Sequence, residues 1–149
     1  MLDCGIPNRA DSLKRIVGGV KTEVGEYPWQ VGLIWNGPEL ENQDCGGALV
    51  GDKYVVTSAT CVNGYDASDY QVRVGDTSLD EEFEADAFTV DIASIKQHPD
   101  FDKSTFRYDI AVLELTDPVS LTEYPNIKPI CLPEAGALFP GEAIMSGWG

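Results

Sequence analysis

Short runs of β-branched and aromatic residues recur along the chain, and clusters of turn-forming residues separate them. Apolar runs of this length between Gly, Pro, Asn and Asp clusters are typical of strands in an all-β protein. The pattern therefore predicts six strands, at residues 29–35, 48–50, 54–58, 70–74, 88–95 and 109–115. Residues 59–62 are expected to form one helical turn after the third strand, and little other helix is expected.

Six strands at this spacing predict a small closed antiparallel barrel, because closure removes the exposed edges that an open sheet would leave. The chain has 149 residues and a mass of 16.2 kDa. That length is enough for one hydrophobic core, so a single domain is the simplest expectation. No apolar run approaches the roughly 18 residues of a membrane span.

The net charge is -15, from 25 acidic and 10 basic residues. Nucleic acid is therefore not expected as a partner, since binding to phosphates requires a basic surface. An acidic surface favours basic partners or cations, although solubility alone also accounts for it.

Four cysteines, at positions 4, 45, 61 and 131, allow three pairings and show no close-spaced zinc pattern. Cys45 and Cys61 flank a predicted strand–turn–strand segment, which favours a local bridge. Disulfides indicate an oxidising compartment. Residues 1–15 nevertheless hold no apolar run long enough for a secretory signal. Two explanations stay open: a signal was removed, or the sequence is an internal piece with a starting methionine.

The chain contains the segments Cys-Gly-Gly-Ala-Leu-Val at 45–50 and Tyr-Val-Val-Thr-Ser-Ala-Thr-Cys at 54–61. Both resemble the surroundings of the catalytic histidine in chymotrypsin-like and trypsin-like serine peptidases. The resemblance implies the first six-stranded barrel of a double-barrel peptidase. In that family the residue before the second cysteine is the general base. Thr60 occupies that position here. A threonine hydroxyl accepts a proton poorly near neutral pH, so the resemblance implies a peptidase scaffold that has lost its base.

Lys-Arg-Ile-Val-Gly-Gly at 14–19, followed by Pro-Trp-Gln-Val at 28–31, resembles the activation site of a serine peptidase zymogen. It implies an activation leader at residues 1–15, cleavage between Arg15 and Ile16 by a trypsin-like protease, and a partial peptidase domain at 16–149 with the first barrel and the start of the second. In the family, the new amine of the isoleucine pairs with an aspartate beside the nucleophilic serine. Cys4–Cys131 and Cys45–Cys61 match family bridges that keep the cleaved leader attached and enclose the base loop.

Asp-Ile-Ala-Val-Leu-Glu-Leu at 109–115 resembles the strand that carries the family's catalytic aspartate. That carboxylate normally orients the imidazole and stabilises the imidazolium. Asp109 is expected to face Thr60 and at most to accept a hydrogen bond from its hydroxyl. His98 is the only histidine, and we interpret it as a solvated or loop-capping residue, not as a displaced base.

The Ser-Gly-Trp-Gly segment at 146–149 resembles the start of the family's second barrel. Residues 1–149 contain no Gly-Asp-Ser-Gly-Gly nucleophile segment, which in the family also supplies the oxyanion hole. The resemblance thus covers almost all of the chain but only a little over half of a family peptidase. It predicts no amidolytic activity.

Residues 76–86 carry six acidic residues and no basic one. Trypsin-like enzymes can bind calcium in the corresponding loop through carboxylate and carbonyl oxygens. Asp76, Glu84 and Asp86 are the candidate ligands, and the alternative is a solvated acidic hairpin tip. No other cofactor is expected.

Three hypotheses for the function remain. The first is a secreted, catalytically inactive serine peptidase homologue that acts by binding a protein partner. The second is an incomplete piece of a longer secreted serine endopeptidase. The third is a barrel that binds calcium or a partner by itself.

Overall fold

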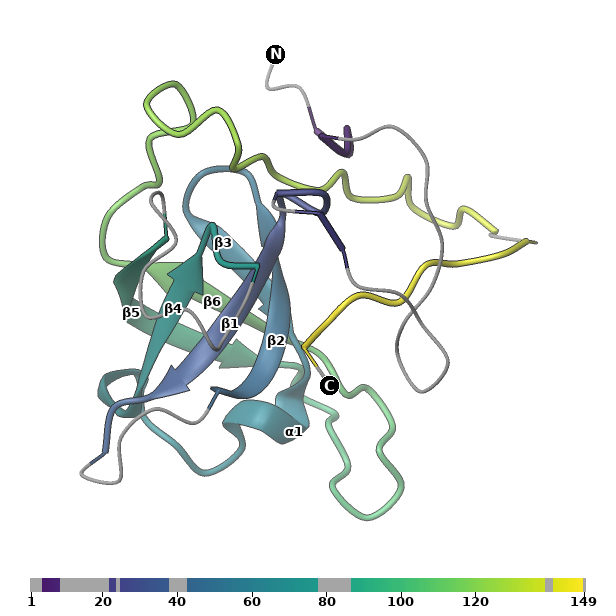
Figure 1. Ribbon diagram of the computed structural model, residues 1–149. Coiled ribbons are helices and arrows are strands. Elements are labelled where there is room, and N and C mark those ends of the chain that lie inside the picture. Colours follow the sequence, from purple (N-terminus) through teal and green to yellow (C-terminus); the bar gives the residue numbers. More distant parts are fainter. Residues whose placement is uncertain are drawn as a thin grey trace.

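The computed structural model describes residues 4–8, 22–23, 25–37, 43–77, 87–138 and 141–148, with only the backbone of residues 43 and 44. Six antiparallel strands form a closed barrel in the order β1-β2-β3-β6-β5-β4 (Figure 1). The strands are β1 (Gln30–Trp35), β2 (Gln43–Val50), β3 (Tyr54–Thr57), β4 (Tyr70–Val74), β5 (Phe88–Gln97) and β6 (Ala111–Leu115). Two short helices follow β3, namely α1 (Ala59–Val62) and the 3₁₀ helix η1 (Ala67–Asp69).

The predicted all-β fold and six-stranded barrel are confirmed. The largest difference lies in β2, which begins five residues before the predicted run. The prediction missed these residues because polar residues and two glycines precede Ala48. β5 extends two residues further than predicted. The last strand was predicted to start at Asp109 and instead starts at Ala111, because Tyr108 adopts a left-handed backbone conformation and Ile110 N donates to the Tyr108 carbonyl. The helix η1 was not predicted.

Alternation of buried and exposed residues fills the barrel interior. β4 and β6 both place every second residue inside, as the apolar alternation of a half-buried strand requires. The fully buried side chains include Val31, Leu33, Leu49, Val55, Val72, Val74, Leu113 and Leu115, which come from five of the six strands. Within the described ranges, no helix is long and apolar enough to cross a membrane.

Gly47 lets β2 pass close to its neighbours. A Cβ atom at this position would lie 2.8 Å from the carbonyl oxygen of Val56 and 2.9 Å from Cγ1 of Val55. Both contacts are shorter than real Cβ atoms allow, and the first is to backbone. The glycine is therefore required by the packing of β2 against β3.

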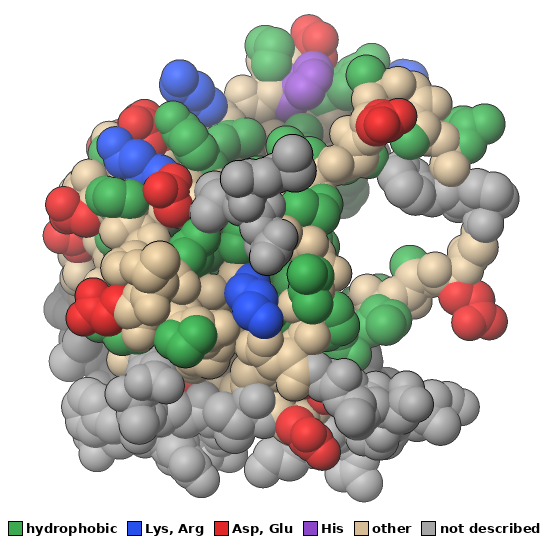
Figure 2. Space-filling view, turned by 90° about the horizontal axis from the view of Figure 1, so that it is seen from above, with side chains coloured by type: hydrophobic (Ala, Val, Ile, Leu, Met, Phe, Trp, Pro, Cys, Tyr) green, Lys and Arg blue, Asp and Glu red, His purple; other side chains and the backbone are tan. Residues whose placement is uncertain are grey.

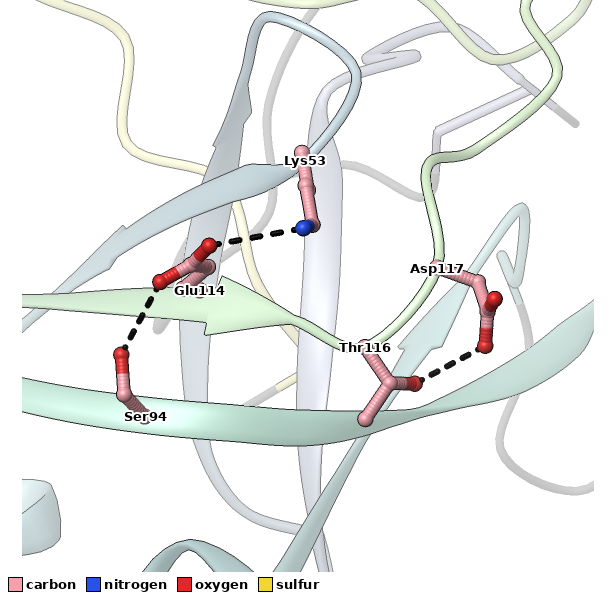
Figure 3. A network of polar contacts seen from close by, with 5 residues as sticks. All are labelled: Lys53, Ser94, Glu114, Thr116 and Asp117. Atoms are coloured by element: carbon pink, nitrogen blue, oxygen red, sulfur yellow. Dashed lines mark hydrogen bonds and ion pairs between the residues drawn. The ribbon is translucent and has the colours of Figure 1, made fainter.

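A polar network on the outside of the barrel joins three elements (Figure 3). Glu114 on β6 pairs with Lys53, which precedes β3, at 3.4 Å, and accepts a hydrogen bond from Ser94 on β5 at 3.2 Å. About a third of each ion-paired side chain is exposed, so the contribution of the pair to stability is small.

The N-terminal residues 4–8 lie against the last third of the chain. Cys4 is bonded to Cys131, and Gly5 N donates to the Pro129 carbonyl at 2.9 Å. The Asn8 side-chain amide donates to the carbonyls of Gly25 and Asn126, both at 3.1 Å. This part of the predicted leader is therefore held by both covalent and polar contacts.

The C-terminal described residues extend away from the barrel and return to it (Figure 1), and an open gap separates an arch of chain from the barrel in Figure 2. The return is fixed by two contacts: the Ser146 hydroxyl donates to Gln30 at 2.8 Å, and Trp148 Nε1 donates to the Thr77 carbonyl at 3.2 Å. Several apolar side chains of this C-terminal segment are strongly exposed, among them Leu132 at 65%, Leu138 at 89%, Ile144 at 77% and Met145 at 78%.

Replacing Gly47 with alanine is expected to destabilise the barrel by about 1–3 kcal/mol, because the added methyl group must push apart two paired strands. The matched control is Gly141→Ala, where a Cβ would meet nothing within 4 Å. That variant should change the free energy of unfolding by less than about 0.5 kcal/mol. Denaturant titration monitored by tryptophan fluorescence measures both, and equal effects would contradict this account of β2.

The polypeptide of residues 1–149 is expected to self-associate despite its charge, because Leu132, Leu138, Ile144 and Met145 expose apolar surface within one short C-terminal segment. Sedimentation velocity over a range of concentrations should show the average mass increasing with concentration. A variant with Leu138→Ser and Ile144→Ser should shift this onset to higher concentration. A sharp monomeric boundary for the unmodified chain at high concentration would contradict the expectation.

Candidate functional site

The helix α1 begins directly after β3 and presents Thr60 at one end of the barrel. Ser58 is its N-cap, with an extended backbone and a side-chain oxygen that accepts a hydrogen bond from Cys61 N at 3.3 Å. Serine is favoured at this position because its hydroxyl satisfies one of the N–H groups that lack an intrahelical partner. The predicted helical turn at 59–62 is thus present, and the strand before it ends one residue earlier than predicted.

Three further contacts hold α1 in place. The disulfide Cys45–Cys61 ties it to β2, with Cα atoms 6.1 Å apart. The Gln97 side-chain amide on β5 donates to the Val62 carbonyl at 3.3 Å. Ala59 and Val62 are completely buried in the core. These contacts fix α1 against the barrel, so the backbone position of residue 60 does not depend on its own side chain.

Asp109 binds Thr60 through both carboxylate oxygens. Oδ1 accepts from the Thr60 backbone N–H at 2.7 Å, and Oδ2 accepts from the Thr60 hydroxyl at 2.9 Å. The expectation that Asp109 faces Thr60 agrees with this geometry. The expectation that a hydroxyl bond is all it accepts was wrong, because the first turn of a helix also offers unpaired backbone N–H groups.

Chemically, this pair consists of a hydroxyl that donates and a carboxylate that accepts, and a threonine hydroxyl is a poor proton acceptor near neutral pH. The Thr60 hydroxyl is exposed, yet its hydrogen points at Asp109. A general base must instead present a lone pair with a pKa near the working pH. An imidazole meets that requirement, whereas a hydroxyl does not.

The loop between β5 and β6 leads into Asp109 and has a fixed conformation. His98 stacks on Tyr108 with ring centroids 4.7 Å apart and planes 10° from parallel. Nδ1 of His98 accepts from Asp100 N at 3.1 Å. Phe106 and Tyr108 both adopt the left-handed region, with φ of 55° and 57°. His98 therefore caps this loop, in agreement with its interpretation from sequence.

Asp102 closes the same loop from within. Its carboxylate accepts from the Ser104 hydroxyl at 2.6 Å, the Thr105 hydroxyl at 2.7 Å and Ser104 N at 2.9 Å. Its backbone also pairs with Arg107. The hydrogen bonds from Ser104 and Thr105 stabilise the ionised form and lower the pKa of Asp102 from 3.8 to about 2.

Of the three candidate calcium ligands, only Asp76 lies within the described residues. Asp76 is buried and forms an ion pair with Arg73. A cation at Asp76 would compete with that guanidinium, so the observed contacts fit the ion pair better than calcium. Among the residues that the structure describes, no three His, Cys, Asp or Glu side chains gather to hold a metal. The calcium site stays a prediction.

The predicted cleavage site also falls outside the described part of the chain. Neither Arg15 nor Ile16 belongs to the described residues, and the same holds for Glu84 and Asp86 of the acidic segment. Cleavage between Arg15 and Ile16 therefore stays a prediction as well.

Sequence reasoning missed two side chains that position the site, Gln97 and Asp102, and the contacts of Asn8 that hold the N-terminal residues. Gln97 and Asn8 reach partners far away in the sequence, which no local pattern reveals. Asp102 was detectable in principle. An aspartate two residues before a serine and three before a threonine is a common signal of a side-chain-capped turn.

Comparison with known proteins identifies similar sequences along almost the whole chain. The family model described as Trypsin matches residues 16–149. The chain is 35% identical over 150 residues to transmembrane protease serine 9 of Rattus norvegicus, across 99% of its own length and 14% of that protein. It is 32% identical over 151 residues to the serine proteinase stubble of Drosophila melanogaster, and 37% identical over 152 residues to the serine protease filzig of the same species.

These relatives are much longer than the chain. Each of the two Drosophila comparisons covers 99% of this chain but only 19% of stubble and 9% of filzig. The similarity therefore concerns one segment of each relative.

The loop that leads into Asp109 should lose stability between about pH 3.8 and pH 2. The folded pKa of Asp102 lies below its unfolded value, so the unfolded chain binds more protons in this interval and stability falls as pH falls. Above pH 3.8 the Asp102→Asn variant should be less stable than the unmodified protein, and the difference should shrink as the pH approaches 2. Denaturant titration of both proteins at several pH values measures it. A difference that is constant with pH would contradict the assigned cause.

Proposed function

The chain belongs to the trypsin family of serine peptidases, and on this premise we propose that it is a catalytically inactive member that acts by binding. The observation that carries the proposal is the hydrogen bond from the Thr60 hydroxyl to Asp109 at 2.9 Å. Asp109 is proposed as the remaining acid of the triad and Thr60 as the substituted base.

The chemical argument concerns the step that the base performs. In this family the imidazole removes the proton of the nucleophilic serine and later returns it to the leaving amine. General acid–base catalysis contributes about 10²–10⁴-fold to such a reaction. Thr60 has no basic lone pair near neutral pH, and its hydroxyl is already a donor to Asp109. The proton of a serine placed beside it would find no basic acceptor at this position.

A binding role is supported by the integrity of the frame around Thr60. The disulfide Cys45–Cys61, the N-cap Ser58 and the buried residues of α1 hold the helix in place without the family's base. Such a barrel presents a rigid surface to a protein partner. Two disulfides support a secreted location, since they persist in oxidising compartments.

We also propose a division at Arg15–Ile16 between a leader and the peptidase-like domain 16–149. The start of the family match at Ile16 supports this boundary. Cleavage there by a trypsin-like protease would leave the leader bonded through Cys4–Cys131.

A second candidate is that the sequence forms part of a longer secreted serine endopeptidase. The length of the relatives favours it, because the chain covers less than a fifth of each. Reading the gene beyond the codon for Gly149 separates the two: an in-frame Gly-Asp-Ser-Gly-Gly segment supports the second candidate. Even then, Thr60 would leave that protein without its base.

The polypeptide of residues 1–149 is expected to show no amidolytic activity before or after treatment with trypsin, and no labelling by a serine-directed fluorophosphonate probe. Thr60→His should leave this polypeptide inactive, since residues 1–149 contain no Gly-Asp-Ser-Gly-Gly segment. Turnover of peptide amide substrates after inhibition of the added trypsin, with active trypsin as the positive control, measures both. Specific labelling together with turnover would contradict the proposal.

A chimera isolates the contribution of position 60. Residues 1–149 are joined to the serine-containing second barrel of an active relative, and the chimera is assayed with Thr60 unchanged and with the substitution Thr60→His. The unmodified chimera should be inactive, and the variant should gain at least about 100-fold in kcat/KM. If both chimeras turned over the substrate equally well, the threonine at position 60 would not abolish peptidase activity, and the proposal would be contradicted.

A further inference from the structure

A hollow of about 400 Å³ opens on the barrel, and none of its lining residues belongs to the Thr60–Asp109 pair. Its wall combines the residue after β1, the helix η1, the first residue of β4 and the middle of β5. The described residues that line it are Asn36, Ala67, Ser68, Tyr70, Asp91 and Ile92.

The floor of the hollow is apolar and rigid. Tyr70 and Ile92 are 3% and 6% exposed and belong to the barrel core, and Ala67 packs against that core. The ring of Tyr70 also lies edge to face with those of Trp35 and Tyr65, at centroid distances of 5.2 and 5.4 Å. Because these three rings support one another, the floor is formed before any ligand arrives.

The polar groups around the hollow leave acceptors unused. The side-chain amide nitrogen of Asn36 donates to the Ser68 carbonyl at 3.2 Å, which leaves its oxygen as an acceptor. Asp91 accepts from Gln71 Nε2 at 2.7 Å through Oδ1, and among the described contacts Oδ2 has no partner. Among the described residues that line the hollow there is no Lys or Arg.

We propose that this hollow binds an arginine or lysine side chain of a basic protein segment. Guanidinium and ammonium groups carry only donors, which match the free oxygens of Asn36 and Asp91. The aliphatic stem of such a side chain would lie on Ala67, which is half-buried. The net charge of -15 favours the approach of a basic partner.

The inference rests on the binding role proposed above and extends it by naming the chemistry of the partner. It depends on a surface that shares no residue with the peptidase-like site. If no basic peptide binds in the hollow, the proposed absence of peptidase activity still stands. If the chain proves to have peptidase activity, the proposal for the hollow still stands.

The test measures binding of a fluorescein-labelled peptide, Gly-Ser-Arg-Gly-Arg-Ser-Gly, to the chain of residues 1–149 with both disulfides formed. Fluorescence anisotropy at low protein concentration and moderate salt gives Kd. The same peptide with glutamine in place of both arginines is the peptide control, and it should show no saturable binding.

Two variants with the same change of charge locate the site. Asp91→Asn removes the free carboxylate oxygen and should weaken binding about tenfold, the usual effect of losing a hydrogen bond between charged groups. Asp117→Asn removes an exposed charge outside the hollow, on a side chain that accepts a hydrogen bond from Thr116 at 3.1 Å. It should change Kd by less than about twofold, because an exposed carboxylate attracts a peptide cation only weakly. Near-ultraviolet circular dichroism shows whether both variants keep the native packing.

Equal weakening by the two variants would overturn the proposal, because it would mean that the peptide responds to total charge and not to the hollow. Absence of saturable binding, or binding that Asp91→Asn leaves unchanged, would overturn it as well. A selective loss in Asp91→Asn supports it.

Discussion

The antiparallel pairing of β3 with β6 determines where Thr60 and Asp109 lie. Thr57 at the end of β3 is paired with Ala111 at the start of β6, so the chain leaves one strand and enters the other at the same end of the barrel. Thr60 follows this pair by three residues and Asp109 precedes it by two. Two side chains 49 positions apart therefore meet at hydrogen-bonding distance. The pairing in turn needs the close approach of β2 at Gly47, which places β3 in the barrel.

This geometry exists whether or not the residue at 60 can take up a proton. The strands, the N-cap Ser58, the disulfide Cys45–Cys61 and the bond from Gln97 to α1 position a side chain without regard to its chemistry. A frame of this kind supports catalysis when an imidazole stands in it and supports only a hydrogen bond when a hydroxyl does. The fold around position 60 therefore does not depend on which of these side chains stands there.

The sequence predicted the barrel because apolar alternation has a period of two and turn residues separate the strands. It predicted β2 least well, since Gly46 and Gly47 are poor strand formers by propensity, and Gly47 is needed there for tight packing. The meeting of Thr60 and Asp109 came from the family resemblance, because no local pattern encodes a contact over 49 residues. The hollow at Tyr70 and Asp91 was not predicted at all. It depends on the register of β4 with β5, in which Gln71 faces Asp91, and register is a tertiary property.

Asp109 has a structural task that does not depend on the side chain at position 60. Its Oδ1 accepts the backbone N–H of Thr60, one of the N–H groups at the start of α1 that have no partner within the helix. Any residue at 60 except proline would offer that N–H. The carboxylate would therefore be useful for the fold in a protein with an imidazole, a hydroxyl or an apolar side chain at this place. It follows that the acid of the pair does not by itself indicate peptidase chemistry. The proposal of an inactive member therefore rests on position 60, where this chain has a threonine.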